Sequence, residues 1–549
     1  MTAARRCFPS LCFLLLATLP VTHAAGADGT SGRPPNVLVI LADDMGYSDA
    51  GCYGGEIATP NIDALAEGGI RFTQFYNTGR CWPSRAALLS GYYAQQVNRD
   101  PPGARPKWAV LVPDLLRRTG YRTYHSGKWH VDGPVLAGGF DRSYELVDPD
   151  RDFGPKEHRL DDRPLPPPRP EERYYGTTAI AEHALGWLDE HEAGHAEKPF
   201  FLYLAFMAPH FPLMAPEADI ARYRGRYDEG WDAIRGRRLK RQRELGIYGG
   251  ELSRRDPRSV PGWNLKEDEL RARIGPGEVG RALAWDELTP EQKAFQSAKM
   301  AIHAAMVDRM DREIGRVVER LRKSGKLDTT LILFASDNGA SAEQIIRGDG
   351  HDRSASPGSA RSFLCLGPGW STAANTPFRL HKSWNHEGGI ATPLIVHWPA
   401  GIRDRGEIRH APGHFIDIVP TILALAGVAA PDEWGGERRP PLPGRSLVPA
   451  FTKDAPIGRE FLFFKHAGNR ALRLGDWKIV AAGPGSPWEL YDLSRDRAET
   501  TDLAAREPSR VAELSAIWSR ADAEYDRQGT TGKPLQKPAR GEPAKGASR

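Results

Sequence analysis

Cysteine is scarce in this sequence, with five in 549 residues. Cys7 and Cys12 fall in an N-terminal stretch that we expect to be removed, which leaves Cys52, Cys81 and Cys365. Three cysteines cannot all pair within one chain, so a framework built only on disulfides is excluded. In an oxidising compartment at least one thiol is therefore unpaired or chemically altered. For Cys81, the ordinary alternative to a chemical role is a buried, inert cysteine.

Strong net charge and long hydrophobic runs are also absent. The net charge of +4 is too small to favour nucleic acid or an anionic membrane as a partner. Past the N-terminal segment, no apolar run is long enough to span a bilayer. Hydrophobic residues make up 40% and charged residues 26%, as in ordinary globular proteins. The length allows one large core and at least one smaller unit.

The N-terminus has the order of features that is typical of a secretory signal. Arg5 and Arg6 form a basic start, residues 11–19 form a short apolar run, and small residues surround Ala24 and Ala25. We therefore expect residues 1–25 to be a signal peptide. The mature chain is then exported, to the periplasm or to the medium.

Short apolar runs alternate with helical patterns through most of the chain. Such runs are typical of buried strands, and they occur at residues 36–41, 121–127, 199–206, 330–336 and 393–398. The longest helical pattern covers residues 291–323. Strands that alternate with helices predict an α/β fold, in which helices cover both faces of a sheet.

Two regions depart from this alternation. Residues 215–280 are rich in Arg, Gly and Pro and indicate an irregular insertion, whose arginine cluster at 235–243 favours a solvated helical face over contact with an acidic substrate. Residues 455–525 contain short apolar runs that predict a small antiparallel C-terminal subdomain. The main domain then covers residues 35–450, and the Lys-, Pro- and Gly-rich tail 529–549 is typical of disorder.

Polar residues follow three of the predicted strands. Asp43 and Asp44 follow the first, Asp337 and Asn338 follow another, and His210 lies a few residues past a third. Ligands of open α/β sheets bind at the carboxyl ends of the strands. The oxygen donors suit a hard cation such as Ca²⁺ or Mg²⁺, whereas turn or cap roles are the alternative for Asp and Asn.

A second group of candidates surrounds the stretch "GRCWPSRAALLSG". Cys81 stands at the start of a helical pattern, where backbone N–H groups and the helix dipole favour an anion or a thiolate. Arg85 adds a fork of donors that suits a sulfuryl or phosphoryl group. Lys128 and His130 follow another predicted strand, and Lys382 lies in "LHKSWNHEGG". This collection suits hydrolysis of an anionic ester.

These motifs resemble those of the type I sulfatases, the formylglycine-dependent branch of the alkaline-phosphatase superfamily. "CWPSR" matches the family's Cys-x-Pro-Ser-Arg signature. The family's order is also kept by "NVLVILADDMGYSDAGCYG", "TPNIDALAEGGIRFTQFY", "GKWH", "APHFP", "SDNG", "HEGGIATPLIVHWP" and "WELYDLSRD". The resemblance runs from about residue 35 to about residue 503 and is strongest to bacterial arylsulfatases. It implies an alkaline-phosphatase-like fold, with a large mixed, mostly parallel sheet flanked by helices.

The resemblance implies that a maturation enzyme oxidises Cys81 to Cα-formylglycine, which is an aldehyde. One hydroxyl of its hydrate attacks sulfur and displaces the alcohol, and the second hydroxyl then expels sulfate. The implied ligands of one Ca²⁺ per chain are Asp43, Asp44, Asp337, Asn338 and the modified Cys81.

The resemblance also implies roles for the other candidates. Arg85 holds the modified residue and the ligand carboxylates, and Lys128 and Lys382 bind sulfate oxygens. His130 takes the proton from the second hydroxyl. His210 contacts the sulfate and, with Lys382, protonates the leaving oxygen. The implied reaction is hydrolysis of sulfate monoesters of a small molecule or a glycan, and the alcohol is aryl, alkyl or carbohydrate.

Two other functions are compatible with the same residues. Some relatives hydrolyse phosphonate monoesters or phosphodiesters with the same modified cysteine. A protein that binds sulfated glycans without turnover is the second alternative. Rates on matched sulfate and phosphate esters separate the first from a sulfatase, and measurable turnover excludes the second.

Overall fold

The computed structural model describes residues 33–530. The predicted signal peptide lies outside the described residues, as does the predicted tail from residue 531 onward. Residues 529 and 530 of that predicted tail are described, and Gly529 is the last residue of helix α13 (Pro508–Gly529).

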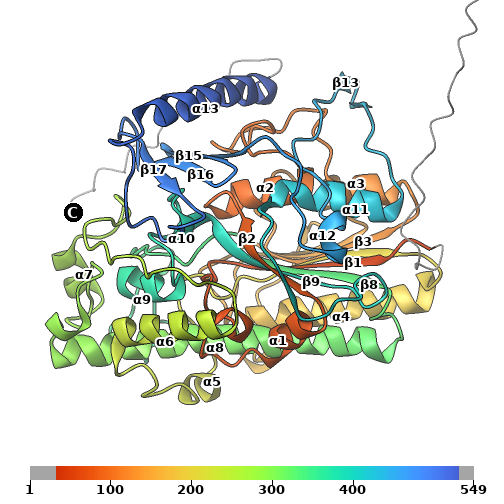
Figure 1. The fold of residues 1–549 in the computed structure, drawn as a ribbon. Helices are drawn as coiled ribbons and strands as arrows, with labels where there is room; N and C mark the ends of the chain where they lie inside the picture. Colours follow the sequence, from red (N-terminus) through yellow and green to blue (C-terminus); the bar gives the residue numbers. More distant parts are fainter. Residues whose placement is uncertain (1–32, 531–549) are drawn as a thin grey trace, which may run out of the picture. The chain divides into compact units, whose positions relative to one another are not determined.

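A mixed sheet of 11 strands lies at the centre of the fold (Figure 1). Its order is β10-β2-β9-β8-β1-β7-β3-β4-β5-β6, and β11 also pairs with β2. The strands are β1 (Asn36–Ala42), β2 (Ile70–Tyr76), β3 (Arg122–Gly127), β4 (Arg142–Leu146), β5 (His158–Leu160), β6 (Arg163–Pro164), β7 (Phe200–Ala205), β8 (Thr330–Ser336), β9 (Ala391–His397), β10 (Glu407–Arg409) and β11 (Gly413–His414).

The middle of this sheet is parallel. Strands β8, β1, β7, β3 and β4 run in one direction, and β9 runs antiparallel to both β8 and β2. Every residue of β1, β7, β8 and β9 is buried, because helices cover both faces of these apolar strands. The predicted mixed, mostly parallel sheet is confirmed.

Helices lie on both sides of the sheet (Figure 1), with α2, α3 and α11 on one face and α1, α4 and α8 on the other. Besides α13, the helices are α1 (Pro60–Glu67), α2 (Cys81–Ser90), α3 (Val112–Arg117), α4 (Gly176–His195), α5 (Glu217–Ala221), α6 (Gly230–Glu244), α7 (Glu267–Arg273), α8 (Pro290–Lys323), α9 (Gly367–Ala374), α10 (Glu387–Ile390), α11 (Ile418–Ala426) and α12 (Val448–Thr452). Helix α8 begins where the sequence predicts, because Thr289 caps it by accepting from the N–H of Gln292.

The segment 215–280 carries the three helices α5, α6 and α7. Its arginine cluster is solvated in part, as predicted, because Arg237, Arg241 and Arg243 are exposed. Arg235 and Arg238 are buried instead. Arg238 Nη1 lies 2.8 Å from Asp49 Oδ1, and Arg238 Nε lies 2.8 Å from Glu56 Oε2. These carboxylates compensate the charge of the guanidinium, so Arg238 attaches α6 to the core.

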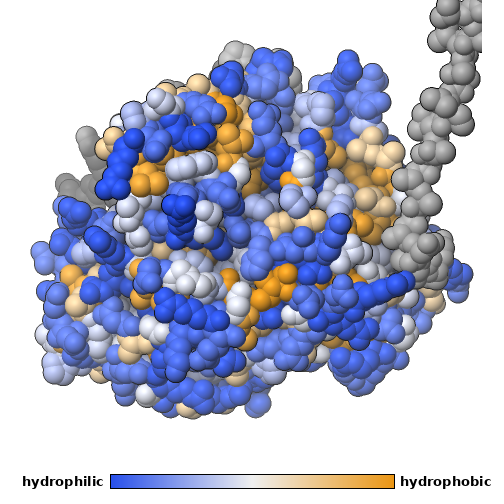
Figure 2. All heavy atoms as spheres, in the orientation of Figure 1, coloured by the Kyte–Doolittle hydropathy of each residue, from blue (hydrophilic) through white to orange (hydrophobic). Residues whose placement is uncertain are grey.

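A four-stranded antiparallel sheet follows near the C-terminus, as predicted, with α13 packed against it (Figure 1). Its strands are β14 (Leu462–His466), β15 (Asn469–Leu474), β16 (Trp477–Ala481) and β17 (Glu489–Asp492), and a short hairpin of β12 (Glu433–Trp434) and β13 (Glu437–Arg438) precedes it. Hydrophilic residues predominate on the face in Figure 2, and apolar residues gather beside α13. Within residues 33–530, none of the helices combines the length and the apolar character that a bilayer crossing needs.

Candidate active site

The two predicted sets of oxygen donors meet at the carboxyl ends of β1 and β8. These strands are parallel neighbours, and their register pairs Ala42 with Ser336. The residues that follow them therefore lie side by side. Asn338 Nδ2 donates to Asp44 Oδ1 at 2.6 Å, which joins one set to the other.

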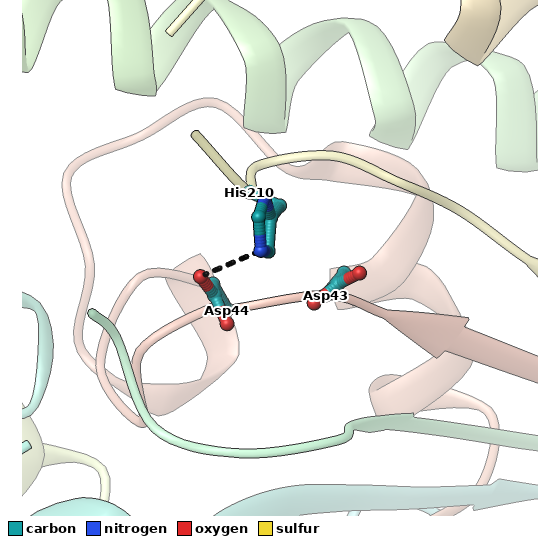
Figure 3. Close-up of side chains that lie close together, drawn as sticks. All are labelled: Asp43, Asp44 and His210. Atoms are coloured by element: carbon teal, nitrogen blue, oxygen red, sulfur yellow. Dashed lines mark ion pairs between the residues drawn. The ribbon is translucent and has the colours of Figure 1, made fainter. Parts of the chain in front are cut away.

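His210 completes a compact group with two of these acids. Ligand atoms of Asp43, Asp44 and His210 lie within 4.8 Å of one another, and all three residues are buried. Figure 3 shows the imidazole facing the two carboxylates, with His210 Nε2 3.8 Å from Asp44 Oδ2. His210 follows β7, the other parallel neighbour of β1, so the sheet brings all three residues to one edge.

The oxygen cluster fits a hard divalent cation. Asp43 Oδ1 and Asn338 Oδ1 are buried and have no hydrogen-bond partner, which is rare for polar atoms in a folded protein. Burial, and then the charge of Asp43, raises the pKa of Asp337 to about 8. A bound cation would offset this crowding of carboxylates, and carboxylate and amide oxygens are the ligands such cations prefer.

Arg85 is fully buried beneath this cluster. Its Nε donates to Asp337 Oδ2 at 2.9 Å, its Nη2 lies 3.4 Å from Asp43 Oδ2, and its Nη1 donates to the backbone oxygen of Lys128 at 3.0 Å. One planar guanidinium therefore joins the ends of β1, β3 and β8, which suits the fixed fork of an arginine.

Two lysines also contact the acids. Lys128 Nζ pairs with Asp43, and Lys382 Nζ lies 2.7 Å from Asp44 Oδ1. Burial opposes ionisation of Asp43, but the surrounding cations, Lys128 foremost, outweigh it and lower the pKa of Asp43. The lysines thus keep positive charge at the edge of the cluster.

Cys81 is the first residue of α2, as its place in the motif predicts, and its side chain lines a cavity of about 380 Å³. The same cavity is lined by the predicted residues Lys128, His130, His210 and Lys382. Further lining residues are Arg80, Trp82, Trp129, Glu145, Leu146, Val147, Pro149, Met207, Phe211 and Arg347. Arg85 and the four oxygen donors do not line the cavity. They affect it through the lining residues that they contact.

The pKa values of both histidines of the cavity are lowered, which favours their neutral forms. Burial, and then the charge of Lys382, lowers the pKa of His210 well below its usual range. His210 Nδ1 faces the backbone oxygen of Phe211, to which a ring N–H donates. In that tautomer Nε2 carries no proton and faces Asp44. His130 is exposed, yet enclosure by the surrounding protein and then the charges of Lys128 and Arg85 lower its pKa as well.

The sequence analysis missed Glu343, which connects two cations of the site. Its Oε2 lies 3.4 Å from Lys382 Nζ, and its Oε1 lies 3.1 Å from Arg80 Nη2. Glu343 is 3% exposed, so its partners compensate the charge it buries. The available signal was its position five residues after Asn338, in the loop that leaves β8.

The three described cysteines are all free. Burial raises the pKa of the Cys365 thiol to about 12 and raises that of Cys52 as well. Neither thiol lines the cavity, so both are buried and inert.

Comparison with known proteins shows the family to which the chain belongs. A family model described as "Sulfatase" matches residues 35–428, which is more than half of the chain. The chain belongs to the sulfatase family. A second model, described as the C-terminal part of N-sulphoglucosamine sulphohydrolase, matches residues 379–517 of this sulfatase.

Curated relatives align with this sulfatase over most of their length. It is 33% identical to a sulfatase of Schizosaccharomyces pombe, over 90% of this chain and 94% of the relative. It is 31% identical to the arylsulfatase of Klebsiella aerogenes (75% and 91%) and 27% identical to the N-acetylgalactosamine-6-sulfatase of Sus scrofa (86% and 77%). The chain is thus a sulfuric ester hydrolase.

A solved structure supports the fold of this sulfatase. The structure of Ps i-CgsB in complex with k-i-k-neocarrahexaose matches with a TM-score of 0.63 at 24% identity, and the match covers 91% of this chain and 94% of that chain. The alkaline-phosphatase-like architecture implied by the sequence motifs is confirmed.

Proposed function

We propose that the chain hydrolyses sulfate monoesters with a Cα-formylglycine made from Cys81. The observation that carries this proposal is that Cys81 lines one cavity together with the three side chains that contact the acidic cluster. These are Lys128, His210 and Lys382. Positive charge around a cysteine at a helix N-terminus suits an anionic ester.

We propose Ca²⁺ as the cation, held by Asp43, Asp44, Asp337, Asn338 and the modified Cys81. The unpartnered oxygens of Asp43 and Asn338 support this assignment, as does the absence of soft donors other than Cys81 from the set. When bound, such a cation orients the sulfate and favours an ionised hydroxyl as nucleophile.

Formylglycine supplies a hydrated aldehyde with two hydroxyl groups. One serves as the nucleophile and the other expels the sulfate afterwards, which a thiol cannot do. Cys81 is 3% exposed and Arg85 is fully buried. An enzyme that reads these residues needs access to both, so we propose that the modification precedes folding of this region.

The chain's own residues then bind the ester and move protons. Lys128 and Lys382 bind sulfate oxygens, and Arg85 keeps the acids in place from beneath. His130 is neutral, so it can accept a proton from a hydroxyl of the modified residue. Burial, and then the charge of Lys382, lowers the pKa of His210. A bound anion offsets the charge of Lys382, so His210 can then serve as a proton donor to the leaving oxygen.

The substrate that we propose is a sulfate monoester of a sugar or of a phenol. Relatives named arylsulfatase and N-acetylgalactosamine-6-sulfatase support both possibilities. The size of the cavity, about 380 Å³, supports a single ring with its sulfate.

We also propose the chain organisation given by the sequence. A signal peptide at residues 1–25 directs export to the periplasm or the medium. A catalytic domain at 35–450 carries the inserted segment 215–280, and a C-terminal subdomain covers 455–525.

Matched esters test the proposed reaction. The purified protein should hydrolyse 4-nitrophenyl sulfate faster than 4-nitrophenyl phosphate and faster than bis(4-nitrophenyl) phosphate. Faster turnover of the phosphodiester would reject the sulfatase assignment in favour of the phosphodiesterase alternative. Absence of turnover on all three esters and on sulfated sugars would favour a binding protein.

A further inference from the structure

Trp263 stands out at the surface near the cavity. Among residues 33–530 it is the large hydrophobic side chain that is exposed, at 48%. It lies in the loop between α6 and α7, within the segment 215–280 for which the proposed reaction has no role. An indole has a large apolar face, and one exposed beside a ligand cavity is available to pack against the part of a ligand that extends from it.

The indole is held in place from two sides. Trp263 Nε1 donates to Glu343 Oε1 at 2.8 Å, and Arg80 Nη2 lies 3.1 Å from the same oxygen. The guanidinium of Arg80 lies 5.5 Å from the centre of the Trp263 ring. A ring fixed in this way loses little conformational freedom when a ligand packs on it.

Arg80 connects Trp263 to the cavity. The Arg80 guanidinium also lies 5.3 Å from the ring centre of Trp82, and both Arg80 and Trp82 line the cavity. Trp263 itself is not among the lining residues. A molecule confined to the cavity therefore does not reach Trp263, whereas one that extends past Arg80 does.

We propose that Trp263 is a stacking platform for the sugar ring next to the sulfated ring of a glycan substrate. This inference rests on the proposed function and names its substrate class. The C–H face of a pyranose packs on the exposed face of the indole, and its hydroxyls reach the charged rim. Arg80 and Arg347 both line the cavity, and the side chain of Arg347 is 42% exposed.

The observations favour a sugar over a second aromatic ring. The cavity is lined by charged donors and acceptors, namely Arg80, Arg347 and Glu145, as well as by aromatic rings. A sugar satisfies both kinds of neighbour, because it has one apolar face and a rim of hydroxyls. A one-ring aryl sulfate is accommodated by the cavity alone.

Binding measurements without turnover test the platform independently of the reaction. The probes are 6-sulfated N-acetylgalactosamine, 6-sulfated N-acetylglucosamine and a sulfated galactose, each as the monosaccharide and as a disaccharide with the sulfated ring at the non-reducing end. Calorimetry in Ca²⁺-containing buffer measures their Kd with the Cys81→Ala protein. We expect at least one disaccharide to bind about tenfold more tightly than its monosaccharide.

Two substitutions of Trp263 distinguish stacking on the sugar from the hydrogen bond that Trp263 donates to Glu343. In the Cys81→Ala background, Trp263→Ala should remove the gain from the second ring. Trp263→Phe keeps an aromatic face but lacks the N–H that Glu343 accepts, and it should retain most of the gain. Trp434→Ala is the matched control, because Trp434 also stacks with an arginine, Arg118 at 3.9 Å, away from this cavity. It should leave the gain unchanged.

Two binding results would overturn the proposed platform. If no disaccharide in the panel binds more tightly than its monosaccharide, the platform is overturned. It is also overturned if Trp263→Phe loses as much of the gain as Trp263→Ala, because the hydrogen bond to Glu343 would then be the cause. Turnover of 4-nitrophenyl sulfate and of the same sulfated sugars by the wild-type protein is measured alongside. Absence of turnover on all of them would reject the proposed function without bearing on these affinities.

Discussion

Arg85 Nη2 lies 2.8 Å from Asp337 Oδ2, and both side chains are 0% exposed. The same guanidinium faces Asp43. Because neither acid is accessible to water, burial and their mutual repulsion oppose ionisation, and the positive charge beneath them favours it.

Replacement of Arg85 by alanine should therefore destabilise the protein strongly. It leaves two carboxylates buried without their cation, and breaking a buried pair in this way costs about 3–5 kcal/mol. Urea unfolding of wild type and Arg85→Ala measures the difference. Ca²⁺ should recover part of the loss, since it binds the same acids. Equal unfolding free energies would contradict this account of Arg85.

Calcium should stabilise the folded protein through the four oxygen donors. A cation at 100 times its Kd adds about 2.7 kcal/mol, so Tm should rise with Ca²⁺ concentration in the wild type. Asp337→Ala should abolish the rise and the activity together. Asp349→Ala is the control, because Asp349 is an exposed acid away from the cluster. A Tm rise that survives in Asp337→Ala would remove Asp337 from the ligand set.

Cys81 should carry the aldehyde or its hydrate in active protein, which peptide mass spectrometry detects. Cys81→Ala should abolish turnover, and Cys81→Ser should nearly do so in a host that modifies only cysteine. Cys52→Ala and Cys365→Ala are matched controls that should retain turnover, because both thiols lie outside the cavity. Full activity from protein with an unmodified Cys81 thiol would reject the mechanism.

Loss of Lys382 or His210 should slow the reaction according to the leaving group. Removal of one preorganised charge costs about 10²–10³ in rate, and loss of a general acid costs about 10²–10⁴. The losses in Lys382→Ala and His210→Ala should be larger for aryl sulfates with poor leaving groups, which need a proton. Steady-state rates over phenols of graded pKa measure this. A constant loss across the series would exclude the leaving-group role.

Asp152 should make stability fall as pH rises. Burial raises its pKa to about 7 in the folded protein from 3.8. Its folded state holds the proton more tightly than the unfolded chain, so its contribution is complete below about pH 4 and is lost as pH rises through about 7. The loss is at most about 4 kcal/mol. Asp152→Asn removes this dependence. Urea unfolding at pH 5 and pH 8 measures the unfolding free energy of wild type and of Asp152→Asn. The same change between the two pH values in both proteins would contradict the prediction.

The parts of the site that lie in local motifs could be predicted from the sequence. Asp43 and Asp337 directly follow strongly apolar strands, and parallel pairing brings such ends together. Cys81 opens a helix whose pattern is visible in its own ten residues. In these cases a neighbouring element determines where the side chain goes.

Contacts made across long stretches of chain could not be predicted in this way. Arg238 is part of an arginine-rich run that suggests solvent, yet its partner Asp49 lies 189 residues earlier. Trp263 and Glu343 are 80 residues apart in segments without a periodic pattern. Their pairing depends on where the loops that carry them cross, and periodicity does not report this.

The C-terminal sheet reaches back to the loop that carries Lys382. Asn469 Nδ2 donates to the backbone oxygen of Ser383 at 2.8 Å, across 86 residues of sequence. Lys478 Nζ, from β16, lies 2.9 Å from Glu387 Oε1 in α10. On the ribosome, a chain that has emerged only as far as α12 (Val448–Thr452) lacks both contacts and leaves Glu387 without its cation. The loop that carries Lys382 is therefore anchored late in translation, and nascent chains that stall before β16 should be inactive whatever the state of Cys81.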